Sequence, residues 1–163
     1  MKTHSRQRKR QVSRPTRGYQ DHLFDSELEA AISIVLKDRV TPLGGHHHGQ
    51  VELTIKYLGK DGATRWYVPD WQVVGHPKVL IEAKARVDAR SRNHLKAARE
   101  QGYQIGIVFP NQRASELPLF PNAELSMGQW LDAHGIRYVT CPEQSLQLLN
   151  NLIFTDPSSE EAI

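Results

Sequence analysis

The sequence predicts an α/β (α+β) fold in which a mixed β-sheet is flanked by helices. Three observations lead to this prediction. Segments with apolar residues at helical spacing alternate along the chain with short apolar segments typical of strands. The length of 163 residues suits one domain with a substantial core. The composition, 39% hydrophobic and 24% charged residues, is ordinary for a globular protein.

The first helix and the first strand are predicted from their apolar periodicity. A helix is expected over about residues 26–38, where Ser26 is a candidate N-cap and apolar residues recur at helical spacing. After a loop that contains Pro42, residues 51–57 alternate between apolar and polar side chains, which indicates a half-buried strand. The sequence GKDG at residues 59–62 is typical of a tight turn and therefore predicts a hairpin.

Two further strands are expected before the middle of the chain. Residues 64–68 should pair back onto the preceding strand as the second arm of the hairpin. Residues 78–85, with the sequence KVLIEAKA, form an apolar segment that ends in charged groups. Because side chains alternate across a strand, Leu80, Glu82 and Lys84 are expected on the same face.

The second half of the chain is predicted to alternate between helices and strands. Gly102 and Gly135 each follow a helical pattern, as expected for residues that end helices, and Ser126 is a candidate N-cap. The expected order is a helix at about 89–101, a strand at 104–109, a helix that begins after residue 126, a strand at 136–140 and a helix at 145–153. The helices then cover a mixed sheet.

Positive charge is concentrated at the N-terminus. Seven of the 21 basic residues lie within residues 1–18, where no acidic residue occurs, so 14 basic and 18 acidic residues remain in the rest of the chain. Such a segment is too polar to fold alone and is suited to bind a polyanion, although a solubilising or targeting tail is the alternative. We therefore predict a disordered basic tail at residues 1–20, one folded domain at 21–154 and a flexible C-terminal tail at 155–163.

Two groups of residues are candidates to contact a nucleic acid. Within the tail they are Arg8, Lys9, Arg10, Arg14 and Arg17. The second group follows the charged end of the predicted strand and comprises Arg86, Arg90, Arg92, His94, Lys96 and Arg99. Three tryptophans, Trp66, Trp71 and Trp130, are expected in the core rather than as platforms for base stacking.

The cellular location is predicted from what the sequence lacks. The single cysteine, Cys141, cannot form an internal disulfide, which favours a reducing compartment. No segment has the length and apolar character of a signal peptide or a membrane span. The protein is therefore expected to be cytoplasmic, with no membrane partner.

Three charged residues are candidates for a catalytic metal site. Pro69 ends strand pairing before Asp70, and if residues 64–70 and 79–85 form neighbouring strands, Asp70 approaches Glu82. Two converging carboxylates suit Mg²⁺ or Mn²⁺, and Lys84 on the same face can contact a phosphate. The pattern P-D-x(n)-E-x-K is the signature of a large nuclease superfamily. The alternative is an ordinary surface ion pair between Glu82 and Lys84.

Several segments from residue 24 to residue 140 resemble the phage endonuclease I family of Holliday-junction resolvases, which has the PD-(D/E)xK nuclease core. The segments are SELE, YVPDW, VLIEAKA, RSRNHLKAAREQ, IGIVF and GQWLDAHGIRY, in this order. The resemblance implies a metal-dependent endonuclease whose catalytic residues are Glu29, Asp70, Glu82 and Lys84, with Asp70, Glu82 and Glu29 as the metal ligands. Glu27 is the alternative to Glu29.

The resemblance also implies how the protein assembles and what it acts on. Family members are domain-swapped homodimers in which the first helix and a following segment cross to the partner. The implied function is resolution of branched double-stranded DNA with Mg²⁺, for which Mn²⁺ substitutes, in a bacterial or phage-infected host cytoplasm. A transposon-end or restriction-type endonuclease with the same core and a non-catalytic DNA-binding module are the alternatives. The consecutive His46, His47 and His48 have no assigned role.

Overall fold

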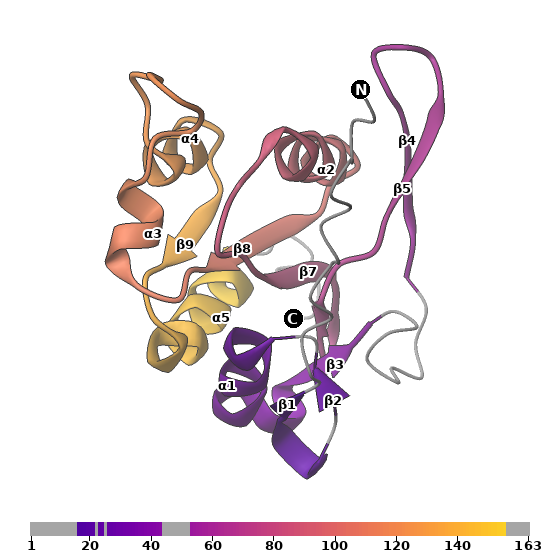
Figure 1. The fold of residues 1–163 in the computed structure, drawn as a ribbon. Helices are drawn as coiled ribbons and strands as arrows, with labels where there is room; N and C mark the ends of the chain where they lie inside the picture. Colours follow the sequence, from indigo (N-terminus) through magenta and orange to yellow (C-terminus); the bar gives the residue numbers. More distant parts are fainter. Residues whose placement is uncertain (1–15, 22, 25, 44–52, 156–163) are drawn as a thin grey trace, which may run out of the picture.

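A five-stranded mixed β-sheet organises the protein (Figure 1). The computed structural model describes residues 16–21, 23–24, 26–43 and 53–155. The strand order is β3-β6-β7-β8-β9, in which β3, β6 and β7 pair antiparallel and β7, β8 and β9 pair parallel. The bounds of the strands are β3 (Val40–Pro42), β6 (Trp71–Val73), β7 (His76–Ala83), β8 (Gln104–Val108) and β9 (Arg137–Val139). The predicted class, a mixed sheet flanked by helices, is confirmed.

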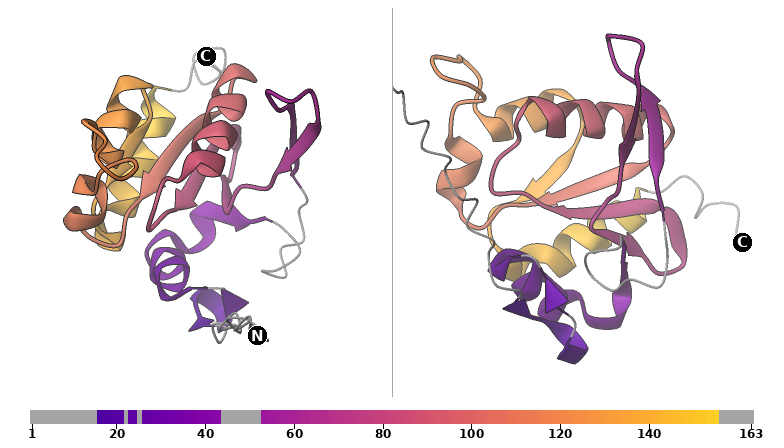
Figure 2. Two further views of the ribbon diagram at one scale, coloured as in Figure 1. Left: turned by 45° about the horizontal axis from the view of Figure 1, so that its top comes forward. Right: turned by 45° about the vertical axis from the view of Figure 1, so that its right-hand side comes forward.

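Helices cover both faces of this sheet (Figure 2). On one face, α1 (Glu27–Leu36) and α5 (Ser145–Phe154) pack against Val79 and Ile81 of β7. On the other face, α2 (Ala89–Glu100) and α4 (Met127–Ala133) pack with Leu80. The alternation predicted for β7 is therefore confirmed, and Glu82 lies on the face that α2 covers. A short helix, α3 (Gln112–Glu116), follows β8.

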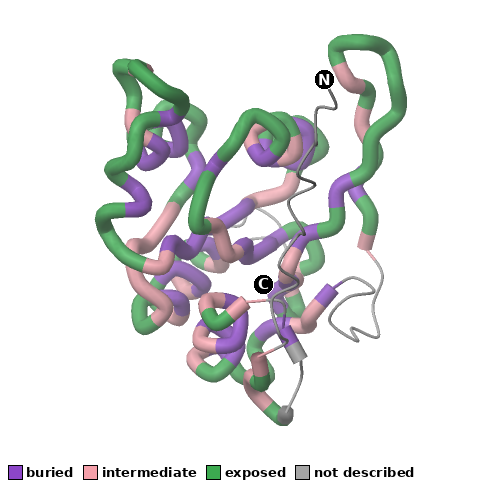
Figure 3. Tube along the Cα trace, viewed as in Figure 1, coloured by how far each residue is buried: buried purple, intermediate pink, exposed green. Residues whose placement is uncertain are grey.

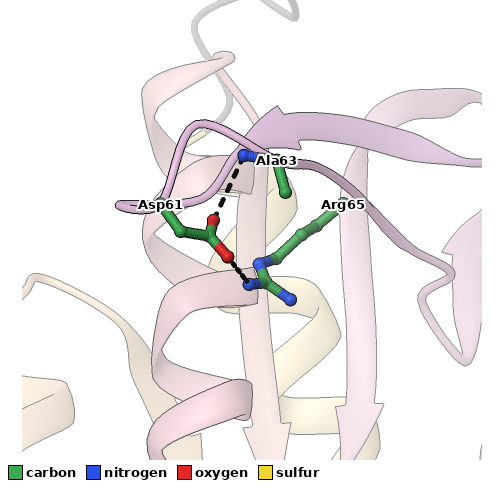
Figure 4. Close-up of polar contacts among 3 residues, drawn as sticks. All are labelled: Asp61, Ala63 and Arg65. Carbon is green, nitrogen blue, oxygen red and sulfur yellow. Dashed lines mark hydrogen bonds and ion pairs between the residues drawn. The ribbon is translucent and has the colours of Figure 1, made fainter.

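The β4–β5 hairpin is separate from the main sheet. It consists of β4 (Ile55–Leu58) and β5 (Thr64–Tyr67), which pair only with each other. In its turn, a carboxylate oxygen of Asp61 accepts a hydrogen bond from the backbone N–H of Ala63, and the other oxygen lies 2.7 Å from Nη2 of Arg65 (Figure 4). Gly62 adopts a φ of 77°, which favours glycine there. The predicted hairpin is confirmed.

Within the described residues, the other elements are three short turns of 3₁₀ helix and one small strand pair. The turns are η1 (Tyr19–Asp21), η2 (Lys37–Arg39) and η3 (Pro142–Gln144). The strand pair is formed by β1 (Thr16–Arg17) and β2 (Leu23–Phe24), so the last residues of the predicted tail carry secondary structure. Residues 1–15 and 156–163, which include most of both predicted tails, lie outside the described residues.

The predicted caps mark helix ends. The hydroxyl of Ser26 accepts a hydrogen bond from the Glu29 N–H at 3.1 Å, and Ser126 forms a complete capping box with Gln129. Helix α1 ends at Leu36, two residues before the predicted limit, because Lys37 adopts a φ of 51°. Buried residues follow the sheet and its facing helices (Figure 3). Within the described ranges, no helix has the length and hydropathy needed to cross a bilayer.

One predicted strand relation is wrong. The hairpin strand β5 is not the neighbour of β7, because a separate short strand, β6, begins at Trp71 and takes that position. Residues 64–70 therefore divide into β5 and a short connection to β6. The predicted approach of Asp70 to Glu82 is nevertheless observed, because Asp70 directly precedes β6 and β6 pairs with β7.

Candidate functional site

Strand pairing fixes the position of Asp70. Trp71 pairs with Ile81 across β6 and β7, so Asp70 lies opposite the end of β7. Its Oδ2 accepts a hydrogen bond of 2.9 Å from the backbone N–H of Ala83. Its backbone carbonyl accepts a second bond of 2.9 Å from the N–H of Leu43. The Asp70 carboxylate is thereby held beside Glu82, the residue that precedes Ala83.

Glu82 and Lys84 form an ion pair at the end of β7, in which Glu82 is buried and Lys84 is half-buried. Glu82 is 1% exposed, and its Oε2 lies 3.1 Å from Nζ of Lys84. Among the described residues, Oε2 makes no hydrogen bond of normal geometry. The backbone of Lys84 is fixed because its N–H donates to the carbonyl of Val108. Because Glu82 is buried, this pair differs from the exposed surface pair considered as the alternative. Removing the Glu82 charge from water costs desolvation energy, which an exposed pair does not pay.

Glu29, on the helix that covers the opposite face of the sheet, is near enough to Asp70 to act on its charge. It lies in the first turn of α1 and is 8% exposed. The Ser26 hydroxyl donates a 2.9 Å hydrogen bond to Oε2 of Glu29, so the cap also orients this side chain. The negative charge of Glu29 contributes to raising the pKa of Asp70. Glu27 is exposed, which supports Glu29 as the acidic residue of the site.

The site has an excess of negative charge. The pKa of Asp70 is raised well above its usual value because the protein removes its carboxyl group from water and because Glu82 and Glu29 repel its charge. The pKa of Lys84 is raised, chiefly by Glu82 and also by Asp70. The Lys84 ammonium group is thus attracted by Glu82 and Asp70, while Glu29 acts on Asp70. A bound cation would favour the ionised form of Asp70, as expected for a metal ligand.

The carboxylates provide only part of a metal coordination shell. In the part of the chain that the structure describes, no three His, Cys, Asp or Glu side chains converge closely enough to enclose an ion. Asp70 and Glu82 are hard oxygen donors, and Oε2 of Glu82 is buried beside the Lys84 ammonium group. This donor set fits a magnesium ion that keeps several water ligands, because Mg²⁺ is commonly bound by one or two carboxylates.

Tyr67 adjoins the site and was not identified from the sequence. Its side chain is 3% exposed, and its hydroxyl makes no hydrogen bond of normal geometry within the described ranges. Burial raises the pKa of Tyr67 well above its usual value, and Glu82 raises it further. The Tyr67 ring stacks on His94 with the ring centroids 4.7 Å apart. The sequence feature that could have identified Tyr67 is its position three residues before Asp70, near the end of a predicted strand.

The predicted DNA-contacting residues fall into different environments. Arg86, Arg90 and Lys96 are exposed near or on α2, whereas Arg92 donates a hydrogen bond to the carbonyl of Val87. Arg99 lies farther along α2 and lines another hollow with Lys78 and Tyr103. Arg17 is exposed in β1. Arg8, Lys9, Arg10, Arg14 and the three consecutive histidines, His46, His47 and His48, lie outside the described residues.

His94 is packed rather than free. It stacks on Tyr67 and meets Tyr57 edge to face at 5.7 Å between ring centroids. Its pKa is lowered to about 4, mainly by burial and then by the positive charges of Arg90 and Lys84. At neutral pH, His94 is therefore uncharged, so a phosphate contact would use a neutral hydrogen bond rather than an ion pair.

The prediction that all three tryptophans lie in the core is wrong for one of them. Trp71 and Trp130 are buried, but Trp66 on the hairpin is 56% exposed. The hairpin stands apart from the main sheet, so the outer side of β5 has no layer against it.

Comparison with known proteins identifies no relative of this chain. No family model matches the sequence, and no curated protein matches it significantly.

Replacement of Asp70 by asparagine is expected to stabilise the metal-free protein. Asparagine keeps an oxygen for the Ala83 N–H but removes repulsion with Glu82 and Glu29. A gain of about 0.5–2 kcal/mol in the free energy of unfolding is expected. For a domain of this size, each kcal/mol corresponds to roughly 2–4 °C in Tm. Thermal unfolding in EDTA, followed by circular dichroism, measures the gain.

The pH dependence of that gain follows from the direction of the Asp70 shift. Because the folded-state pKa is raised, wild-type stability is lost as pH rises from the unfolded-state pKa, about 3.9, through the folded-state pKa. The difference in Tm between Asp70→Asn and wild type should therefore grow as the pH rises above about 4 and through the raised pKa of folded Asp70. The exposed Asp38, replaced by asparagine, is the control. An Asp70→Asn difference that stays constant with pH contradicts the charge repulsion.

Proposed function

We propose that the protein is a metal-dependent, structure-selective endodeoxyribonuclease that resolves branched double-stranded DNA, such as Holliday junctions, by paired phosphodiester hydrolysis. The observation that carries this proposal is the cluster of Asp70, Glu82 and Lys84 at adjoining strand ends. The Asp70 carboxylate accepts a hydrogen bond from the backbone N–H of Ala83 in β7, and the buried Glu82 forms an ion pair with Lys84. The motif resemblance supports assignment to the phage endonuclease I family, with the PD-(D/E)xK core.

Each residue of the cluster has a chemical role in this proposal. Asp70 and Glu82 hold a divalent ion, with Glu29 completing the site, and Mn²⁺ substitutes for Mg²⁺. When bound, the ion lowers the pKa of a water molecule and offsets negative charge on the phosphate. Lys84 directs its ammonium group to the phosphate oxygens, where negative charge increases in the transition state. Water attacks phosphorus and releases a proton to solvent, the bond from phosphorus to the 3′ oxygen breaks, and the 3′ oxygen takes a proton from solvent, which leaves a 5′ phosphate and a 3′ hydroxyl.

Cleavage of both strands of a junction requires two active sites, which a homodimer provides. We propose that the dimer is domain-swapped, with α1 and β3 of each chain placed on the sheet of its partner. In the structure, these elements join the body through pairing of β3 with β6 and through packing of α1 against α5 and β7. The same contacts can form between two chains. Glu29 would then complete the partner's site.

The function is tested with substrates of matched sequence that differ in shape. The full-length protein is incubated with Mg²⁺ and either a four-way junction, a nicked duplex or a linear duplex, and products are separated on denaturing gels. We expect the four-way junction to be cut at least about tenfold faster than the linear duplex, a preference of roughly 1.4 kcal/mol. EDTA should prevent cutting.

The other outcomes separate the alternatives. Sequence-dependent cutting of the linear duplex would favour a transposon-end or restriction-type endonuclease with the same core. Binding of the junction without cleavage in Mg²⁺ or Mn²⁺ would favour a non-catalytic DNA-binding module. A preference for the nicked duplex over the four-way junction would contradict junction resolution.

A further inference from the structure

A large groove lies between the β4–β5 hairpin and helix α2. Its volume is about 1250 Å³, above the roughly 300–1,000 Å³ typical of small-molecule sites. Four basic side chains line it, against two acidic ones, Asp61 and Glu100. The basic residues are Lys60 and Arg65 of the hairpin and Arg90 and Lys96 of α2. The size and charge indicate a polyanionic chain as the ligand.

Tyr57 and His94 line the groove between its basic side chains, and the buried Tyr67 stacks on His94. Tyr57 pairs with Arg65 across the hairpin, and Ile55 pairs with Tyr67, so these four share the side of the hairpin that faces α2. His94 of α2 contacts both tyrosines, edge to face with Tyr57 and stacked on Tyr67. Because His94 is uncharged at neutral pH, the centre of the groove is aromatic and neutral. Cationic edges with an aromatic centre are typical of sites for single nucleic-acid strands.

The hairpin has a fixed position beside α2. Nε2 of Gln101 donates a 2.7 Å hydrogen bond to the carbonyl of Lys56, which joins the end of α2 to β4. The pair between Asp61 and Arg65 holds the turn (Figure 4). Figure 2 shows the hairpin and α2 side by side in both views. The groove therefore exists without a ligand, which reduces the ordering cost of binding.

Tyr67 does not line the groove but is buried between His94, which does, and Glu82 of the carboxylate cluster. One part of Tyr67 stacks on His94 in the groove, and the hydroxyl is close enough to Glu82 for the carboxylate to raise the tyrosine pKa. A strand lying in the groove would therefore extend toward Glu82, Asp70 and Lys84, the residues beside which the proposed function places the phosphate to be cleaved. We propose that the groove binds an unpaired DNA strand next to the phosphate to be cleaved. The link to cleavage rests on the proposed function, whereas binding of the strand does not.

The test measures strand binding by the full-length protein in EDTA, so no catalysis is needed. The probe is a fluorescein-labelled oligo(dT) of about 12 nucleotides, within the range of single-strand site sizes. Replacing Lys60 and Lys96 together with alanine should weaken binding about tenfold. It should also reduce the slope of log affinity against log salt by roughly 0.7 for each lost phosphate contact. Fluorescence anisotropy measures both quantities.

A control double variant loses the same two positive charges as the double variant of Lys60 and Lys96. Arg113 of α3 and Arg137 of β9 are exposed and lie outside the groove, and their double replacement with alanine should leave oligo(dT) affinity nearly unchanged. The basic N-terminal segment is present in every variant, so its contribution cancels. If the Lys60/Lys96 and Arg113/Arg137 double variants lose oligo(dT) affinity equally, the proposal is overturned, because only the total charge of the protein would then determine binding.

Trp66 provides an independent measurement. Its side chain alternates to the outer side of β5 but still borders the groove, and it is 56% exposed, whereas Trp71 and Trp130 are buried. Unlabelled oligo(dT) should quench tryptophan emission, and Trp66→Phe should remove most of that change. Quenching that persists in Trp66→Phe would overturn the assignment of the groove.

A matched duplex and the junction separate the inference from the proposed function. If the groove pair of variants loses duplex affinity as strongly as oligo(dT) affinity, the groove is not specific for an unpaired strand, and the proposal fails. If wild type does not cut junctions but the groove variants still lose oligo(dT) affinity selectively, the proposed function fails and the groove stands. If wild type cuts junctions but oligo(dT) binding is unchanged in the groove variants, the groove alone fails.

Discussion

Glu82→Gln protein is expected to cut four-way junctions about 10⁴-fold or more slowly than wild type, the scale seen when one member of a catalytic unit is removed. Glutamine has nearly the shape of glutamate but a weaker oxygen donor for Mg²⁺ and no charge to pair with Lys84. Junction binding should survive or tighten, because the change removes a negative charge that repels phosphate. Single-turnover cleavage and binding in Ca²⁺ or EDTA measure the two effects separately.

A matched variant controls for unspecific charge effects. Glu143 is an exposed glutamate in η3, far from β7 in the sequence, and Glu143→Gln should cut at the wild-type rate. Circular dichroism and thermal unfolding establish that Glu82→Gln is folded. If a folded Glu82→Gln protein cuts as fast as wild type in Mg²⁺, the metal assignment is wrong.

A mixed dimer should reveal whether the active site is shared between chains. One subunit carries Glu29→Gln and the other carries Glu82→Gln. With a shared site, one site contains both defects and the other contains neither, so the mixed dimer should nick one strand of a junction. If each chain builds its own site, each site contains one defect, and the mixed dimer should be inactive. The difference is between activity at one site and none.

The test requires a mixed dimer that is free of wild-type and variant homodimers. The two variants are co-expressed with different tags and purified in sequence, because a domain-swapped dimer can exchange subunits too slowly for simple mixing. Each variant homodimer must be inactive under either arrangement and serves as the baseline. A mixed dimer that leaves the junction intact, while wild-type dimer with the same tags cuts it, excludes sharing of Glu29.

Local features of the fold were predictable because short-range rules determine them. The Ser26 cap needs only its own helix, and the shared face of Glu82 and Leu80 needs only the alternation of one strand. The hairpin follows from its turn sequence. By contrast, β6 has three residues, and its pairing with β7 depends on contacts that no local pattern contains. The wrong neighbour for β7 came from this missing strand.

The candidate site was predictable in part for the same reason. Asp70, Glu82 and Lys84 were identified from a sequence pattern, and the backbone bond from Ala83 to Asp70 supplies the contact that the pattern left unspecified. Glu29 came only from the family resemblance, since helix α1 packs on the sheet through nonlocal contacts. Tyr67 was missed because a buried tyrosine at a strand end looks like a core residue until its neighbour, Glu82, is known.

The separation of the β4–β5 hairpin from the main sheet has a consequence for local stability. Two-stranded sheets are at best marginally stable by themselves, and here the outer side of the hairpin faces solvent. Its amide hydrogens should exchange with deuterium through local opening, far faster than those of β7, which is paired on both sides in the middle of the sheet. Glu82 thus stands on a strand that is protected on both sides, whereas the hairpin amides exchange through brief openings from the position that the Gln101 hydrogen bond fixes beside α2.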